Sequence, residues 1–247
     1  MALTGAQIVA EVCDTVGKAL TATSRSGMQL QTRALMYINF GQKRIARHYN
    51  FHELDNLQDS AATVDTVKRY PMVSGTNNFG LIRPKDIYSV RLMDSENSKV
   101  IQRRHRRWFD KHYPRPENYS GGRPDIYIRD GNYLEFFRIP NGTFDIYIRY
   151  PQWPTDLTTG SSSDFENKDQ MIITAGIFET YFALEEYIDA KVWYEKFLGQ
   201  LHDAVRAEGD VDWEPVAEGS GDFGYTSASP WIDPYGQSSD PLSGYAD

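Results

Sequence analysis

The densest group of residues that could carry chemistry lies between residues 99 and 115. Cations that neutralise phosphates, interleaved with rings that stack on bases, are typical of a nucleic-acid surface. Apart from a single acid, Asp110, the segment combines seven basic residues with three rings: Lys99, Arg103, Arg104, Arg106, Arg107, Lys111 and Arg115, with Trp108, Phe109 and Tyr113. The same pattern also fits an intersubunit or partner contact, which could face a DNA channel, or a solvated face.

Two further groups have the residue types of a metal site but not the spacing. His48 and His52 are four residues apart, but no acid stands where it could complete a ligand set, so we interpret them as surface residues. Asp210, Asp212 and Glu214 alternate without the glycine and the distal glutamate of a calcium loop. We expect neither a metal nor a cofactor.

Catalytic patterns are equally weak. Adjacent Glu185 and Glu186 would point about 100° apart on a helix, whereas a glycosidase needs two carboxylates that face each other across a cleft. The one cysteine, Cys13, lies in an apolar helical stripe, so we interpret it as a small buried hydrophobe rather than a nucleophile. The sequence therefore predicts a protein without enzymatic activity.

Charge and hydropathy divide the chain unevenly. The net charge is −8, yet eight of the 34 acidic residues follow residue 209, so residues 1–209 hold 26 acids against 26 bases. No apolar segment approaches the roughly 18 residues of a membrane span, and no basic stretch followed by an apolar run opens the chain. We expect a protein made in a cytoplasm, with no membrane contact.

Residues 210–247 read as an extended acidic tail. They contain no lysine or arginine and are rich in glycine, proline and serine, but they also hold six aromatic residues. A purely solvating acidic segment has few aromatic residues, so anchors spaced along the tail indicate a segment that orders on a partner. The anchors that we expect to bind that partner are Trp213, Phe223, Tyr225, Trp231 and Tyr235.

Two helices are expected before the first strands. Apolar residues recur at helical spacing over residues 5–21, with Thr4 as a plausible N-cap, and again up to about Tyr49. The second helix should begin near Ser26, where the spacing to Gln29 fits a capping box. The two helices predict a hairpin whose apolar stripes need a third partner.

Alternating residues then predict strands. Residues 87–92 read as one strand, and residues 99–101 begin another. Residues 125–150 contain three strand segments separated by Asp130-Gly131 and Asn141-Gly142. Both dipeptides favour the positive φ angles of tight hairpins, so the sequence predicts a three-strand antiparallel meander.

A long helix closes the folded part. It should run from about Asn167 to Glu208, with Ser163 and Glu166 at capping-box spacing and possible bends at Gly176 and Gly199. The fold class is α+β. The helical hairpin and the long helix (1–60 and 164–209) form a helical bundle, an antiparallel β-domain (61–163) is inserted between them, and the tail (210–247) extends beyond.

Three segments resemble parts of known phage neck proteins. Residues 44–54, RIARHYNFHEL, resemble the helix end with an arginine, an aromatic residue and Glu-Leu. Residues 120–127, SGGRPDIY, resemble the entry to their β-domain, and residues 134–140 and 147–151 resemble the hairpin that follows. Over about residues 5–208, in this order, the chain is similar to the head-to-tail adaptors of tailed bacteriophages, in the style of the podophage tail tubular protein A family.

The resemblance implies a structural virion protein. It implies a homo-oligomeric ring, typically of twelve subunits, that joins the portal protein to a tail or nozzle protein and continues the DNA channel. It also implies a C-terminal segment that reaches into the portal, the role we assign to the aromatic tail. The alternatives are a nucleic-acid-binding phage protein that uses residues 99–115, with non-specific contact to packaged DNA, and a neck protein with cell-wall hydrolase activity.

Overall fold

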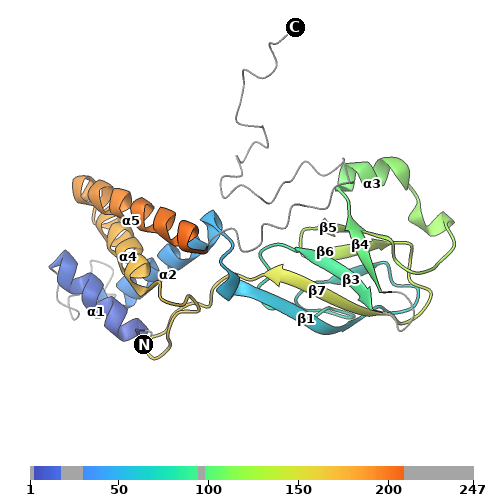
Figure 1. The fold of residues 1–247 in the computed structure, drawn as a ribbon, viewed down its shortest axis with the longest axis horizontal. Coiled ribbons are helices and arrows are strands. Elements are labelled where there is room, and N and C mark those ends of the chain that lie inside the picture. The colour runs from blue at the N-terminus through green and yellow to red at the C-terminus, as the bar shows by residue number, and fades with distance from the viewer. Residues whose placement is uncertain (1–2, 18–29, 94–97, 209–247) are drawn as a thin grey trace, which may run out of the picture. The chain divides into compact units, whose positions relative to one another are not determined.

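The computed structural model of the chain describes residues 3–17, 30–93 and 98–208 (Figure 1). The chain divides into two compact units, one formed by residues 1–51 and 156–247 and the other by residues 52–155. The first, the helical unit, contains helices α1, α2, α4 and α5, and the second, the sheet unit, contains seven strands and the short helix α3. The protein is thus an α+β protein, as predicted.

Helix α1 (Gly5–Val16) begins as expected but ends early. Thr4 is its N-cap: the Gln7 amide donates to the Thr4 hydroxyl, and the Gln7 side chain accepts from the Thr4 amide, which completes a capping box. The predicted extension to residue 21 is wrong, because Gly17 adopts a left-handed conformation (φ 69°) that closes the helix. Cys13 is buried in α1, and burial raises the pKa of its thiol.

Helix α4 (Asp169–Ala183) is the central element of the helical unit, and it packs against α1, α2 (Leu30–His48) and α5 (Tyr187–Glu208). Every residue from Met171 to Phe178 is buried, so the helix has no solvent face over two turns. Glycines let it approach its neighbours closely. A Cβ on Gly176 would lie 2.8 Å from Ile38 Cγ1, and one on Gly41 would lie 2.9 Å from Ala175 Cβ.

The single long helix predicted for residues 167–208 is wrong, because the chain breaks between α4 and α5. Glu185 adopts a left-handed conformation (φ 64°), and its amide donates to the Phe182 carbonyl while the Glu186 amide donates to the Tyr181 carbonyl. These two bonds are a Schellman motif, which normally uses glycine at the left-handed position. The break therefore falls at neither predicted glycine.

The predicted capping box at the start of this helix is also wrong. Helix α4 begins at Asp169, and its N-cap, Lys168, makes no side-chain capping bond. The Ser163 hydroxyl instead donates to the side-chain oxygen of Gln42 on α2 and accepts the Phe165 amide. Ser163 thus ties the loop before α4 to α2 rather than capping the helix.

The sheet unit is built on one curled seven-stranded sheet with the order β1-β7-β3-β4-β5-β6-β2. Its strands are β1 (Asp55–Ala62), β2 (Arg69–Pro71), β3 (Ser89–Met93), β4 (Lys99–Arg103), β5 (Ile126–Asp130), β6 (Tyr133–Phe137) and β7 (Asp145–Pro151). All neighbours are antiparallel except β4 and β5, which pair in parallel at Gln102↔Ile126 and Arg103↔Tyr127. The prediction of a wholly antiparallel sheet is therefore wrong at this one junction.

The predicted meander is correct for its first hairpin and wrong for its third strand. Strands β5 and β6 pair across a turn at Gly131 (φ 59°), but β7 pairs with β1 and β3 rather than with β6. After β6 the Pro140 carbonyl accepts the Thr66 amide, and the buried hydroxyl of Thr63 donates to the Gly142 carbonyl. Proline also lacks the amide that a hairpin strand would need. These contacts lead the chain away from β6.

Two apolar clusters lie on opposite faces of β5. Tyr127 points into the main core of the sheet unit, whereas Ile126 and Ile128 lie with Phe109 and Phe137 in a second cluster. Alternate residues of a strand face opposite sides of the sheet, so β5 is covered on both faces. Helix α3 (Arg106–His112) supplies Phe109 to the second cluster, and the core thereby fixes the position of the predicted basic cluster.

Candidate interaction surfaces

The basic cluster predicted at residues 99–115 lies on β4, α3 and the loop after α3. Arg103, at the end of β4, donates to both carboxylate oxygens of Asp86, at 3.1 and 3.3 Å, and Arg129 on β5 donates to the same carboxylate at 3.0 Å. Burial opposes ionisation of Asp86, but the hydrogen bond and charge of Arg103, a backbone hydrogen bond at Ile87 and the hydrogen bond from Arg129 outweigh it and lower its pKa. Arg103 therefore serves the sheet unit's own ion-pair network.

Two more cations of the cluster are also paired within the sheet unit. Arg106 donates to Asp130 at 2.6 Å, and Lys99 lies 2.8 Å from Asp125. The first pair joins α3 to β5, and the second joins β4 to the residue just before β5, so both ion pairs fasten neighbouring segments together. Arg104 extends over the ring of Trp108, with its guanidinium carbon 4.9 Å from the ring centroid.

The remaining cations of the cluster are Arg107, Lys111 and Arg115. All three are exposed, and within the described part of the chain none of them makes an ion pair. They form a small basic surface on α3 and the loop that follows it. Three of the seven expected cations thus have neither an ion pair nor a ring contact in the described part of the chain.

The three rings of the segment are not available for base stacking. Phe109 is buried, and Tyr113 stacks on Phe137 with 3.7 Å between ring centroids. Trp108 stacks on His112 at 4.2 Å and also carries Arg104 over its ring. The aromatic interleaving in the sequence therefore reflects packing of α3 on the sheet, and the expected stacking surface for nucleic acid is absent from this segment.

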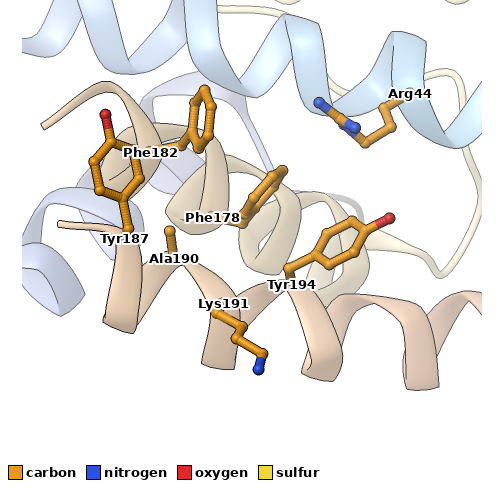
Figure 2. A pocket seen from close by; sticks show the side chains of 7 residues that line it. All are labelled: Arg44, Phe178, Phe182, Tyr187, Ala190, Lys191 and Tyr194. Atoms are coloured by element: carbon orange, nitrogen blue, oxygen red, sulfur yellow. The ribbon is translucent and has the colours of Figure 1, made fainter. Parts of the chain in front are cut away.

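The helical unit contains a pocket of about 370 Å³ between α2, α4 and α5. Figure 2 shows the aromatic rings that line it, two from α4 and two from α5, together with Arg44 from α2. The Arg44 guanidinium donates from Nε and Nη2 to Glu179, both at 2.7 Å, and lies 5.2 Å from the ring centroid of Phe178. The lining residues include no carboxylate, imidazole or thiol. The pocket can hold an apolar side chain, but it has no acid–base pair.

A second apolar surface surrounds the turn between α4 and α5. Its large apolar side chains are unusually exposed: Phe182 (55%), Tyr187 (60%), Ile188 (83%) and Val192 (60%). Sequence reasoning missed this surface because it assumed one continuous helix. The available signal was that Ile188 and Val192 are apolar although they lie outside the stripe of Ala190, Phe197 and Leu201, which is buried.

The histidine and glutamate pairs that we do not expect to act as metal or catalytic groups lie at the surface. His48 and His52 are both exposed, and Glu185 and Glu186 lie in the exposed turn after α4. Among residues 3–17, 30–93 and 98–208 there is no group of three or more histidine, cysteine or acidic residues that could hold a metal ion. In the same residues, no helix has the length and apolar character needed to cross a membrane.

The predicted tail anchors Trp213, Phe223, Tyr225, Trp231 and Tyr235 lie outside the described residues. The last described residue is Glu208, at the end of α5, where its carboxylate is 2.8 Å from the Lys168 amine. Both side chains are largely buried, so the point at which the tail leaves the helical unit is held in place.

Comparison with known proteins identifies a family for the chain. A family model described as "SU10 adaptor protein" matches residues 3–219, which include the sheet unit and all described residues of the helical unit. No curated protein matches the chain. The match confirms the resemblance to phage head-to-tail adaptors and indicates a structural role in the virion, in contact with portal and tail proteins. The chain belongs to the SU10 adaptor protein family, a family of phage adaptors.

Proposed function

We propose that the protein forms a homo-oligomeric ring in the neck of the virion, joins the portal to the tail or nozzle, and continues the DNA channel. The family match over residues 3–219 is the observation that carries this proposal. Twelve subunits and the podophage type of tail follow from the sequence resemblance, as does synthesis in the cytoplasm of the host bacterium. The function is mechanical: the protein binds its neighbours and catalyses no reaction.

We further propose that the tail binds the portal. The tail carries eight acids and no base, and its aromatic anchors would lose conformational freedom only when the portal is present. Because that ordering costs part of the binding energy, assembly would wait for the correct partner. The buried pair of Lys168 and Glu208 supports this proposal, since it gives the tail a fixed origin.

The experiment mixes the purified full-length protein with the portal protein of the same genome and examines the mixture by size exclusion and negative-stain microscopy. We expect a protein that is small alone and forms a ring stacked on the portal. A variant with serine in place of the five anchors should keep its circular dichroism and lose the portal. This variant is preferable to truncation after Glu208, which would place a new carboxylate beside the Lys168 pair.

A protein that ignores the portal would refute the adaptor proposal. An anchor variant that still joins the portal would refute only the role of the tail. The family match favours the portal as the partner. The two outcomes therefore test the adaptor role and the role of the tail independently.

The second candidate function is non-specific DNA contact through Arg107, Lys111 and Arg115, which are exposed and free of ion pairs in the described part of the chain. Three cations give a weak, salt-dependent affinity, with log K falling by about 0.9 per contacted phosphate for each unit of log salt. The variant Arg107→Glu/Lys111→Glu should abolish duplex binding measured by anisotropy at low salt. An unchanged affinity would exclude this surface.

A further inference from the structure

The central position of α4 leaves two outward faces on the helical unit. Helix α2 turns Ala34, Ile38 and Ile45 toward the core, and α5 does the same with Phe197 and Leu201. At 3.6 residues per turn, the opposite side of each helix points away from α4. These two opposite sides carry different charges and both carry exposed apolar residues.

The first face, which we call the turn face, consists of Leu184–Asp189 and Val192. Ile188 is 83% exposed and Val192 is 60% exposed, which is far more than their apolar side chains favour. The acids Glu185, Glu186 and Asp189 surround them, and no lysine or arginine occurs between Lys168 and Lys191. Lys191, next to Val192, is also exposed and lies 4.0 Å from the Glu195 carboxylate. The turn face is therefore apolar at its centre and mainly acidic at its edge.

The second face, which we call the α2 stripe, consists of Met36, Phe40, Lys43 and Arg47. Met36 and Phe40 are 40% and 47% exposed, and Arg47 is exposed beside them. Lys43 makes an ion pair with Asp156, but both side chains remain open to solvent, at 41% and 62%. Helix α2 contains no acidic residue at all. The α2 stripe therefore combines an apolar centre with a basic edge.

We propose that the turn face of one copy binds the α2 stripe of a second copy. Each chain carries both halves of the contact, and the contact joins unlike faces, so it is heterologous and can close into a ring. Within one chain, α2 and α5 both contact α4, and Tyr187 of the turn face shares the lining of the pocket with Arg44 of α2. Ile188 and Val192 do not line that pocket and are exposed, so they remain open to a second copy. The proposal rests on the ring of the proposed function and assigns the surfaces that close it.

The apolar and charged parts of the contact have different roles. Burial of Ile188, Val192, Met36 and Phe40 supplies most of the attraction, since removal of apolar surface from water is the main favourable contribution to protein association. The acids and bases at the edges set the orientation, because the like faces of two copies repel each other. A second copy is therefore favoured over a generic apolar partner.

Charge reversal tests the pairing in full-length protein. One variant, Glu186→Lys/Asp189→Lys, reverses the turn face, and another, Lys43→Glu/Arg47→Glu, reverses the α2 stripe. All four residues lie at the surface, so circular dichroism should match the wild type. The matched control, Glu11→Lys/Asp14→Lys, reverses two exposed acids on α1. Sedimentation velocity, with and without portal protein, measures the fraction of protein in rings.

Each reversed variant should need about tenfold more protein than the wild type to form rings, and the control should behave as the wild type does. An equimolar mixture of the two reversed variants should form rings again, because each reversed face then meets a complementary one. The chain that carries all four changes should also assemble. Rescue by mixing shows that the faces meet between copies, which a merely structural defect could not produce.

Two results would overturn the proposal: reversed variants that assemble like the wild type, or reversed variants that neither mixing nor the fourfold change restores. Failure of the proposed function looks different. If the wild type ignores the portal but self-associates through faces that the swap restores, the contact stands and the portal role falls. If the wild type joins the portal while reversal has no effect, the adaptor role stands and the contact falls.

Discussion

One glycine substitution tests how closely α2 packs on α4. In an exposed helix, Gly→Ala stabilises a protein by about 0.8–1 kcal/mol, because alanine has the higher helix propensity. At Gly176, however, the new Cβ would lie 2.8 Å from Ile38 Cγ1 and 3.2 Å from Val12 Cγ2. Real Cβ atoms do not tolerate the first distance and rarely show the second, so the side chains of Ile38 on α2 and Val12 on α1 would have to shift. We predict that Gly176→Ala destabilises the helical unit.

The size of the destabilisation by Gly176→Ala can also be derived. Overpacking a core typically costs about 1–3 kcal/mol, from which the propensity gain of about 1 kcal/mol must be subtracted. The expected net loss for Gly176→Ala is therefore on the order of 1 kcal/mol. Gly199 on α5 is the matched control, since a Cβ there meets no atom within 4 Å. Gly199→Ala should therefore raise the free energy of unfolding through the higher helix propensity of alanine, without a steric penalty.

The assay is urea unfolding followed by far-ultraviolet circular dichroism, which reports mainly on the helical unit. The free energies of unfolding of the two variants should differ by about 1–3 kcal/mol, with the wild type between them. The reasoning is refuted if Gly176→Ala stabilises the protein as much as Gly199→Ala does. In that case α4 could move away from α2 without cost, and the faces on α2 and α5 would not be held at a fixed separation.

Two further predictions concern the sheet unit and the turn. Burial raises the pKa of Tyr127 to about 12, so the folded chain keeps a proton that the unfolded chain loses near pH 10, and stability falls between pH 10 and 12. Tyr127→Phe should remove up to about 2.7 kcal/mol of this loss in the free energy of unfolding, measured by urea unfolding at each pH. If the free energy of unfolding falls with pH as steeply in Tyr127→Phe as in the wild type, the prediction is wrong. Glu185→Gly should stabilise the helical unit by about 0.5–1 kcal/mol, because glycine adopts φ 64° without strain, whereas Glu186→Gly should not.

Local signals in the sequence predicted local structure well. Thr4 caps α1, Asp130-Gly131 forms the β5–β6 hairpin, and Cys13 is buried. The first two outcomes depend on residues close together in the chain, whose conformational preferences act without help from the rest of the fold, and the apolar helical stripe around Cys13 predicted its burial. The Asn141-Gly142 turn failed because a distant residue, Thr63, binds the same segment and redirects it toward β1. No local pattern contains that contact.

Edge strands and unusual turns were also beyond local reasoning. Strand β1 is exposed on one face and only half-buried on the other at its start, and its sequence DNLQDSAA does not alternate between apolar and polar residues. Its start at Asp55 lies ahead of the change of period near residue 62. The break after α4 places Glu185 where glycine is the usual signal. The parallel pairing of β4 with β5 follows from the path of the chain through α3, which strand patterns do not encode.

The charge pattern of the folded chain differs from what the sequence indicates. The dense basic segment at residues 99–115 drew attention first, yet Asp86, Asp125 and Asp130 pair with much of it inside the sheet unit. In the helical unit α2 has no acid and residues 169–190 have no base, so the two signs lie on different elements, although Arg44 pairs with Glu179 and Lys43 with Asp156.

Charges that are paired within a unit add little to association, whereas separated charges remain available to a neighbour. Surface charges are screened over about 8 Å at physiological salt, so the separated charges act only when two copies are nearly in contact. They would then select the orientation in which the turn face meets the α2 stripe. The helical unit, rather than the basic segment, is therefore where the electrostatics of ring assembly should be sought.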